Sequence, residues 1–491
     1  MTGNCRAGSK RKTPGDEADS DLRDPRDPRN PGPPLLGGLR SRQPDPGRLG
    51  PPDPGVSADD YFRHLYDTEP DFVQLAKQDP DFKAVLQPNG HLDFTNPAAT
   101  MQLTKTLLQA DFGLKIDLPD DRLCPPVPNR HNYILWLKDL MDTTSYEPPG
   151  RPLCGLDVGT GASCIYPLLG TRQRPWSFVA TDVDDKNLSY AQRNIRLNGL
   201  ESRIHLVPRN PDDPLIPLDH PSVKQTPIDF VMMNPPFYAS PEEMMSSAQQ
   251  KSRPPMSACT GAPVEMVCSG GELAHVGRLL RESLDLRDKV RWYTTMLGKL
   301  SSLEALVEQL REQGVDNYAV TEFVQGRKTR RWALGWSFGP MRPAEHAARG
   351  MKAAVWKKLL PPATATDLLE LPVDAPVEPV IARIHEAVGG LELISWSWDA
   401  GAARGLGRAS ENVWSRAWRR KRLREPLQQG QGGVQDASPS QHPAECRLGF
   451  EIRVVMGKVK TSVDLHWREG HDPLLFESFG GFLSTKLKEN K

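Results

Sequence analysis

The 491-residue chain lacks several features that would assign it to well-known classes of protein. No stretch approaches the roughly 18 uninterrupted apolar residues that cross a membrane, and the N-terminus lacks the apolar core of a signal peptide. The 7 cysteines are scattered and none forms a Cys-x-x-Cys pair, which argues against a zinc site or a disulfide framework. We therefore expect an intracellular protein with no membrane segment and no bound metal.

The chain also lacks a net charge, because 62 basic residues balance 62 acidic ones. Any surface for nucleic acid must come from local segregation of charge. Proline and glycine are abundant instead, at 47 and 40 residues, and the mean hydropathy is -0.53. Residues 1–55 concentrate them with almost no apolar surface, so we predict a disordered tail. Its basic run Lys10-Arg11-Lys12 fits a nuclear-import signal, although such runs are common in disordered tails.

Hydrophobic spacing divides the remaining chain into three parts. Residues 56–148 have apolar residues three or four apart, as over 100–108 and 133–141, and we predict a helical N-terminal cap. Residues 149–340 alternate between strand-like and helix-like runs, which predicts a doubly wound α/β sheet of the Rossmann-like class. The predicted strands are 153–158, 177–181, 203–207, 228–233, 291–297, 317–324 and 331–338, with helices near 185–198, 272–286 and 301–313.

The third part, residues 341–491, predicts a smaller α+β domain. Helical spacing covers 355–371, 379–388 and 409–424, whereas 448–456 and 459–467 alternate with period two, as a hairpin does. A segment rich in Gln, Gly and Ser near 426–445 is predicted to be a linker.

The most specific motif is Asn234-Pro235-Pro236-Phe237, which ends a buried-type apolar run. An exocyclic aromatic amine is a poor nucleophile because its lone pair is delocalised into the ring. The Asn234 oxygen and the Pro235 carbonyl can accept hydrogen bonds from its two N–H groups. The prolines stiffen the turn, and Phe237 or Tyr238 can stack on the base. The motif therefore predicts methyl transfer to a planar nitrogen; a plain turn after a buried strand is the structural alternative.

A glycine turn, Gly159-Thr160-Gly161-Ala162-Ser163, follows the first predicted strand. Glycines there let the backbone approach a ligand, and Ser163 stands where a dinucleotide fingerprint has a glycine. This favours a cofactor without phosphates, such as S-adenosyl-L-methionine. Asp182 ends the next strand, where a carboxylate can accept both ribose hydroxyls; alternatively it caps the next helix, a role open to Asp184 or Asp185.

Three basic segments are candidates for RNA contacts. One lies in the long loop 238–267 after the catalytic motif, one between the last two predicted strands, and one in the amphipathic stretch 414–424. A flexible excursion and a charged hairpin are the alternatives for the first two; the third could also bind acidic lipid or an importin. The expected phosphate contacts are Lys251, Arg253, Arg327, Lys328, Arg330, Arg331, Arg419, Arg420 and Lys421.

Taken together, these residues resemble the methyltransferase-like sixteen family of RNA N6-adenosine methyltransferases, relatives of the bacterial ribosomal-RNA adenine N6-methyltransferases of the F type. The resemblance spans about residues 58–338. It implies a class I S-adenosylmethionine-dependent methyltransferase fold and a C-terminal, vertebrate-type RNA-binding domain. The motifs that carry it include residues 159–170, 234–237, 270–273, 296–299, 325–327 and 332–334.

The resemblance also implies roles for single residues. Arg130 would hold the cofactor carboxylate, and Gly159 and Ser163 its methionine part. Asp182 would hold the ribose, and Asn234 would lie between cofactor and target amine. Two departures from the family pattern are Pro211, in place of a cofactor-contacting Thr, and Thr95, in place of a Lys from a loop that gates the cofactor pocket.

We therefore expect an enzyme that uses S-adenosyl-L-methionine to methylate N6 of adenosine in structured RNA. The resemblance implies U6 small nuclear RNA and messenger-RNA hairpins as substrates, and the nucleus as the main location, with the cytoplasm as a second. Two alternatives stay open: the acceptor could be a protein glutamine or an adenine in DNA, or the chain could be a non-catalytic RNA-binding scaffold.

Overall fold

A computed structural model describes residues 58–491 except 250–260, 326–328, 352–353, 422–444 and 489–491. The predicted disordered tail and most of the predicted linker lie outside the described residues, as do four predicted RNA contacts, Lys251, Arg253, Arg327 and Lys328. Among the described helices, none is both long and apolar enough to cross a membrane.

The N-terminal cap is helical, as the spacing of its apolar residues predicts. Side-chain oxygens of Asp71, Asp79 and Asn96 accept backbone N–H groups at three helix starts, and Gly113 ends the fourth helix in the left-handed conformation. The cap contains α1 (Asp59–His64), α2 (Phe72–Gln78), α3 (Pro80–Val85), α4 (Pro97–Phe112) and α5 (Val127–Thr143).

The catalytic part is built on an eight-stranded sheet with the order β3-β2-β1-β4-β5-β7-β6-β8. β7 runs antiparallel to its neighbours β5 and β6, and the pairs among β1 to β5 are parallel. The predicted doubly wound sheet is confirmed. Its strands are β1 (Cys154–Val158), β2 (Ser177–Asp182), β3 (Ile204–Pro208), β4 (Ile228–Met233), β5 (Val290–Leu297), β6 (Tyr318–Gln325), β7 (Thr329–Trp336) and β8 (Arg349–Gly350).

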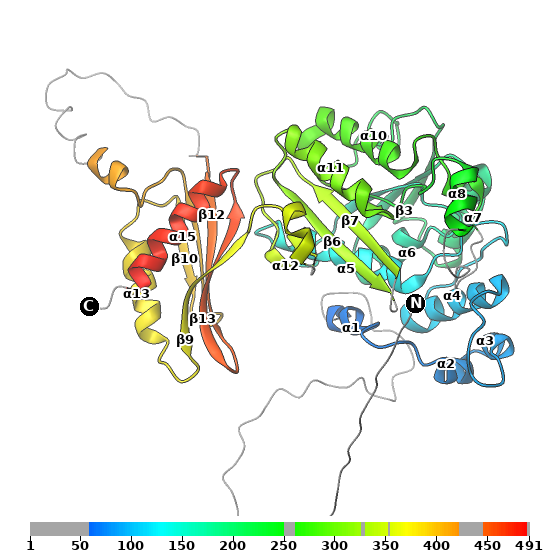
Figure 1. The fold of residues 1–491 in the computed structure, drawn as a ribbon, viewed down its shortest axis with the longest axis horizontal. Helices are drawn as coiled ribbons and strands as arrows, with labels where there is room; N and C mark the ends of the chain where they lie inside the picture. The colour runs from blue at the N-terminus through cyan, green and yellow to red at the C-terminus, as the bar shows by residue number, and fades with distance from the viewer. Residues whose placement is uncertain (1–57, 250–260, 326–328, 352–353, 422–444, 489–491) are drawn as a thin grey trace, which may run out of the picture. The chain divides into compact units, whose positions relative to one another are not determined.

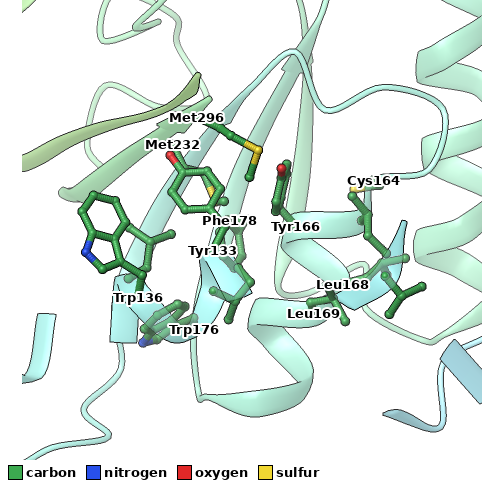
Figure 2. Packing of buried hydrophobic residues seen from close by; sticks show 14 of the residues in the cluster. Tyr133, Trp136, Cys164, Tyr166, Leu168, Leu169, Trp176, Phe178, Met232 and Met296 are labelled. Atoms are coloured by element: carbon green, nitrogen blue, oxygen red, sulfur yellow. The ribbon is translucent and has the colours of Figure 1, made fainter. Parts of the chain in front are cut away.

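Successive side chains of these strands point to opposite faces of the sheet and belong to two hydrophobic cores, one on each face. On β4, Phe230 and Met232 join the core made with α5 and α6, whereas Val231 and Met233 join the core made with α10 and α11. Figure 2 shows the first core, with Tyr133 beside Met232 and Met296. The helices of this part are α6 (Ile165–Gln173), α7 (Asp185–Leu197), α8 (Pro241–Gln249), α9 (Pro263–Met266), α10 (Gly271–Leu286), η2 (Arg287–Lys289), α11 (Leu300–Glu312) and α12 (Glu345–Ala348).

The C-terminal part contains a second, smaller sheet with helices of its own. Its antiparallel sheet has the order β10-β11-β12-β13-β9, and α13 and α15 pack against it through one apolar core (Figure 1). The predicted helix 379–388 and the predicted hairpin are confirmed. The elements are η3 (Ala354–Leu359), β9 (Ala365–Pro372), α13 (Glu378–Gly389), β10 (Ser395–Asp399), β11 (Arg404–Ala409), β12 (Leu448–Met456), β13 (Lys460–Glu469) and α15 (Pro473–Lys488).

Two helices predicted in this part are wrong. Residues 355–371 form η3 and then β9, where the register shifts opposite Val463 and Asp464, so that Leu368 is the extra residue of a bulge. The bulge breaks the period of two and produces spacing that resembles a helix. Of the predicted helix 409–424, the described residues are helical only over 416–421, because Ala409 ends β11.

Two glycines make room for one aromatic ring in the first core. A Cβ atom at Gly155 would lie 2.7 Å from the Phe178 ring, and one at Gly170 would lie 2.6 Å from it. Phe178 is only 1% exposed and its ring contacts Phe230, so it has little room to move. Close packing therefore requires glycine at both positions.

We expect Gly170→Ala to destabilise the protein by about 1–3 kcal/mol, because overpacking against Phe178 outweighs the gain of about 1 kcal/mol that alanine brings to a helix. Gly277→Ala in α10 is the matched control, since the nearest atom to its Cβ would be 3.7 Å away. We expect that variant to gain about 0.5–1 kcal/mol. Urea unfolding measures both; changes of the same sign would contradict the packing argument.

Candidate active site

A cavity of about 620 Å³ opens at the carboxyl ends of β1, β2 and β4. Ligands bind at this edge in open α/β sheets, because the strand-to-helix loops converge there. All the predicted cofactor-binding residues line it together with two of the prolines: Arg130, Gly159, Thr160, Gly161, Ser163, Asp182, Asn234, Pro235 and Pro236. The structure therefore brings together the two halves of the predicted site, although they are far apart in the sequence.

The glycine turn forms the floor of this cavity. Gly159 and Gly161 have φ angles of +72° and +66°, which side chains rarely adopt, so glycine is required by conformation. The Thr160 N–H donates to the Thr181 carbonyl at 2.8 Å, which ties the turn to the end of β2.

Asp182 lies beside the turn, at the end of β2. One carboxylate oxygen accepts the Gly161 N–H at 2.8 Å, and the other accepts the Asp184 N–H at 3.0 Å. Asp184, not Asp182, caps α7, because its side chain accepts the Asn187 N–H at 2.8 Å. The capping alternative for Asp182 is thereby removed. Its burial raises the pKa of the carboxyl. Oδ1 also accepts a hydrogen bond from the Asn187 side-chain amide at 3.3 Å, so Oδ2 is the oxygen that keeps a lone pair for a hydroxyl of a ligand.

Arg130, on α5, brings a buried positive charge to the cavity wall. It is 6% exposed, and its guanidinium donates to Asn129 Oδ1 at 3.1 Å and lies 5.7 Å from the centre of the Tyr166 ring. Among the described residues no carboxylate forms an ion pair with it. Buried charges are normally paired, so this guanidinium fits a carboxylate that a ligand supplies.

Asn234 follows β4 and lies at the edge of the cavity. Its side-chain oxygen is buried and has no hydrogen-bond donor among the residues that the structure describes. Leaving a buried acceptor unpaired costs about 1–3 kcal/mol, so such atoms in native structures call for an explanation. A hydrogen bond from the amine of a bound substrate to this oxygen would explain its burial.

Phe237 does not line the cavity, but two neighbours fix its ring. A Cβ atom at Gly298 would lie 2.8 Å from Phe237 Cδ1, so only glycine fits beside the ring. The Arg331 guanidinium lies 5.3 Å from the ring centre, within the range of a cation–π interaction. Stacking of a base on Phe237 stays a prediction.

Glu272 lies in the 270–273 motif, to which sequence analysis assigned no role, and it holds the backbone at 298–299 beside the Phe237 ring. Glu272 is 1% exposed, and its two oxygens accept the N–H groups of Gly298 at 2.7 Å and Lys299 at 2.9 Å. Lys299 in turn pairs with Glu243 in α8. Only the position of Glu272 after two glycines hinted at such a role.

A second wall of the cavity also escaped sequence analysis. Glu265 in α9 accepts the N–H groups of Leu123 at 2.8 Å and Ala262 at 3.0 Å, which ties the loop before α5 to the segment after the catalytic motif. Leu123 and Glu265 both line the cavity. These contacts join residues more than a hundred positions apart, so no local pattern could reveal them.

The predicted RNA contacts within the described residues lie in two places. Arg330 is exposed on β7 and pairs with Glu322 on β6 at 2.8 Å, as the hairpin alternative implies, whereas Arg331 reaches Phe237. Arg419, Arg420 and Lys421 are exposed on the short helix 416–421. Their contact with RNA stays a prediction.

The two departures from the family pattern also have a place. Pro211 lines the cavity, and its carbonyl accepts a hydrogen bond from Arg278 at 2.7 Å. Thr95 is exposed, donates to Asp93 at 2.6 Å and is not among the residues of the cavity wall. Within the described residues, no cluster of three or more His, Cys, Asp or Glu side chains could hold a metal ion.

Asp157 lies in β1 beneath the glycine turn and is 1% exposed. Burial raises the pKa of this carboxyl to about 7, and the charge of Asp182 adds to the increase. The native protein therefore binds a proton at Asp157 more tightly than the unfolded chain does. Through this group, stability falls as the pH rises from about 4 to about 7.

We expect Asp157→Asn to remove this dependence. The free energy of unfolding of the variant minus that of wild type should be larger at pH 8 than at pH 5 by on the order of 2 kcal/mol, because the asparagine never becomes a buried charge. Urea unfolding at the two pH values measures the difference. Asp60→Asn, at an exposed position of α1, should show no such change; an equal effect of Asp157→Asn at both pH values would contradict the assignment.

Known proteins agree with this geometry. Residues 57–340 match the model of a family described as RNA methyltransferase. The U6 small nuclear RNA (adenine-(43)-N(6))-methyltransferase of Schizosaccharomyces pombe is 35% identical over 404 residues, which cover 82% of this chain and 97% of that protein. The RNA N(6)-adenosine-methyltransferase mettl16 of Danio rerio is 37% identical over 463 residues, covering 86% of this chain and 95% of that protein.

A solved structure is similar as well. The crystal structure of the hMettl16 catalytic domain in complex with MAT2A 3′UTR hairpin 1 is 45% identical, covers 55% of this chain and 92% of that chain, and has a TM-score of 0.50. The family model matches more than half of the chain, and the two relatives align along most of their length. The chain belongs to the METTL16 family of RNA methyltransferases.

Proposed function

We propose that this protein transfers the methyl group of S-adenosyl-L-methionine to N6 of an adenosine in structured RNA. The observation that carries the proposal is the buried Asn234 oxygen, which lies at the edge of the cavity and has no donor within the described part of the chain. A target amine supplies the donor that this atom lacks. The name of the Schizosaccharomyces pombe relative supports U6 small nuclear RNA as a substrate, and the MAT2A 3′UTR hairpin bound in the similar solved structure supports messenger-RNA hairpins.

The cofactor is S-adenosyl-L-methionine, which when bound supplies a methyl group on a positively charged sulfur. The residues of the cavity fit it. Arg130 offers an unpaired guanidinium for the cofactor carboxylate, and the positive-φ turn at Gly159 and Gly161 lets the backbone approach its methionine part. Asp182 Oδ2, which accepts one backbone N–H, has a lone pair for a ribose hydroxyl.

The chain's contribution to the reaction is to orient the amine. Hydrogen bonds from the two N–H groups of the amine to Asn234 Oδ1 and to the Pro235 carbonyl would direct the nitrogen lone pair toward the methyl group. Proline at positions 235 and 236 limits the backbone motion that would misplace these acceptors. No strong general base is required, because the methylated ammonium is acidic and loses its proton readily to water.

RNA contacts follow from charges near the acceptor segment. We propose that Arg331, beside Phe237, and Arg330 contact the backbone of the strand that carries the target, with Arg419, Arg420 and Lys421 contacting RNA from the C-terminal part. The segment with Lys251 and Arg253 and the turn with Arg327 and Lys328 would complete the surface. The target base must leave its stack, which costs a few kcal/mol and favours bulged or looped adenosines.

We propose the nucleus as the main location, with the cytoplasm as a second. The basic runs at 10–12 and 419–424 support this, because clusters of Lys and Arg serve as import signals as well as nucleic-acid contacts.

We expect Asn234→Ala to lower kcat/KM for an RNA hairpin by about 100-fold, because the amine loses one of its two orienting contacts. Binding of S-adenosylhomocysteine should change by less than about fivefold, since Arg130 and Asp182 remain. Transfer of a tritiated methyl group measures the first, and calorimetry the second. Asn89→Ala, at an exposed position of the cap, is the control and should keep full activity. Near-normal methylation by Asn234→Ala would refute the role.

The same assay separates the alternatives. RNA hairpins with one unpaired adenosine, DNA hairpins of the same sequence and a glutamine-containing peptide are compared under identical conditions. We expect label in RNA only. Label in DNA or peptide alone would change the acceptor, and binding of S-adenosylhomocysteine without label in any substrate would favour the scaffold.

A further inference from the structure

The segment 209–216, between β3 and β4, lines one side of the cavity and is held in shape by its own residues. Asp213 Oδ2 accepts the Asn210 N–H at 2.8 Å and the Asn210 side-chain amide at 3.1 Å. Arg209 donates to the Pro214 carbonyl at 3.0 Å, and its own N–H donates to the Asp182 carbonyl at 2.9 Å. The segment is therefore a compact turn attached to the end of β2.

Two residues of α10, one helical turn apart, bind this segment, and one of them, Arg278, also lines the cavity. The Arg278 guanidinium donates to the carbonyls of Pro211, at 2.7 Å, and Asp213. Glu282 accepts the N–H groups of Leu215 at 2.9 Å and Ile216 at 3.1 Å. An ion pair of 3.4 Å joins Arg278 to Glu282, so the two side chains act as one clamp on four backbone groups.

The N-terminus of the same helix contacts the acceptor segment. Gly271 has a φ angle of +66°, which favours glycine, and a Cβ atom there would lie in van der Waals contact with the Ala239 nitrogen at 3.4 Å and the Phe237 carbonyl oxygen at 3.6 Å. The next residue, Glu272, holds the Gly298 backbone against Phe237. One rigid element therefore reaches both the acceptor motif and the far wall of the cavity.

We propose that Arg278 and Glu282 are positioning residues that fix the 209–216 segment as a wall of the cofactor site, so that cofactor affinity depends on the placement of α10. This inference rests on the proposed function. When the 209–216 segment is already ordered, cofactor binding does not have to order it. Without the clamp, binding must order the segment, and the lost conformational entropy weakens the affinity for the cofactor. The proline at 211 has no N–H to anchor it, which leaves its carbonyl as the attachment point.

The chemistry of the clamp makes its side chains hard to replace. Two carbonyls two positions apart in the chain suit the planar fork of arginine, whereas the single ammonium of lysine satisfies such a pair less well. Glutamate presents two acceptor oxygens to two N–H groups, and glutamine replaces one of these acceptors with a donor. We therefore expect Arg278→Lys and Glu282→Gln to be weaker defects than Arg278→Ala.

The experiment measures S-adenosylhomocysteine binding by calorimetry and methyl transfer to an RNA hairpin, both with the full chain. We expect Arg278→Ala to raise the dissociation constant and the KM for S-adenosyl-L-methionine by about tenfold, with kcat and the KM for RNA changed by less than about threefold. Arg278→Lys should recover part of the affinity. A merely structural role would lower the unfolding temperature without this selective change in KM.

Two variants serve as matched controls: Arg196→Ala, at an exposed position of α7, and Asp285→Asn, at an exposed position of α10 one turn beyond the clamp. Both should bind S-adenosylhomocysteine as wild type does. Equal binding by wild type, Arg278→Ala and Glu282→Gln would overturn the inference alone. Failure of the wild-type chain to bind S-adenosylhomocysteine would overturn the proposed function and the inference with it.

Discussion

The side-chain oxygen of Asn234 is buried at the carboxyl end of β4, and none of the described residues donates a hydrogen bond to it. An unsatisfied acceptor in a site of low dielectric is costly, and the same environment makes a hydrogen bond to it strong once a donor arrives. The rest of the site is arranged around this constraint. The glycine turn lets the backbone approach the methyl donor, the prolines hold the acceptors of the amine in place, and the cap supplies Arg130 for the carboxylate of the donor.

Three kinds of support hold that arrangement. The parallel strands β2, β1 and β4 bring Asp182, the glycine turn and Asn234 to one edge, because their carboxyl ends coincide. Arg130 comes from the cap, so the cavity is complete only when α5 is packed on the sheet. The helix α10 follows the acceptor motif and touches both that motif and the opposite wall. Binding of cofactor and acceptor thus rests on elements distant in sequence.

Local pattern located β1 to β7 of the catalytic sheet, because most of their residues are buried and each strand ends near a glycine, a proline or a polar residue. It missed β8, which is two residues long and lies beyond the predicted boundary at 340. It also located Asn234 and Asp182, whose chemistry depends on their place at a strand end. It failed for β9, where the bulge at Leu368 imitates helical spacing, and for β10 and β11, which are short and carry several small or polar residues. Glu265, Glu272, Arg278 and Glu282 act on backbone groups far along the chain, a relation that no spacing within the sequence records.

The most direct test of the central claim is a double-mutant cycle on RNA affinity. It compares wild type with Asn234→Ala, each binding a hairpin with adenosine at the target and one with purine riboside there, which lacks the amine. If the Asn234 oxygen accepts a hydrogen bond from that amine, removing either partner abolishes the same hydrogen bond. The account then predicts a coupling free energy of about 1 kcal/mol or more. Strictly additive losses would show that the oxygen and the amine do not meet, and would contradict it.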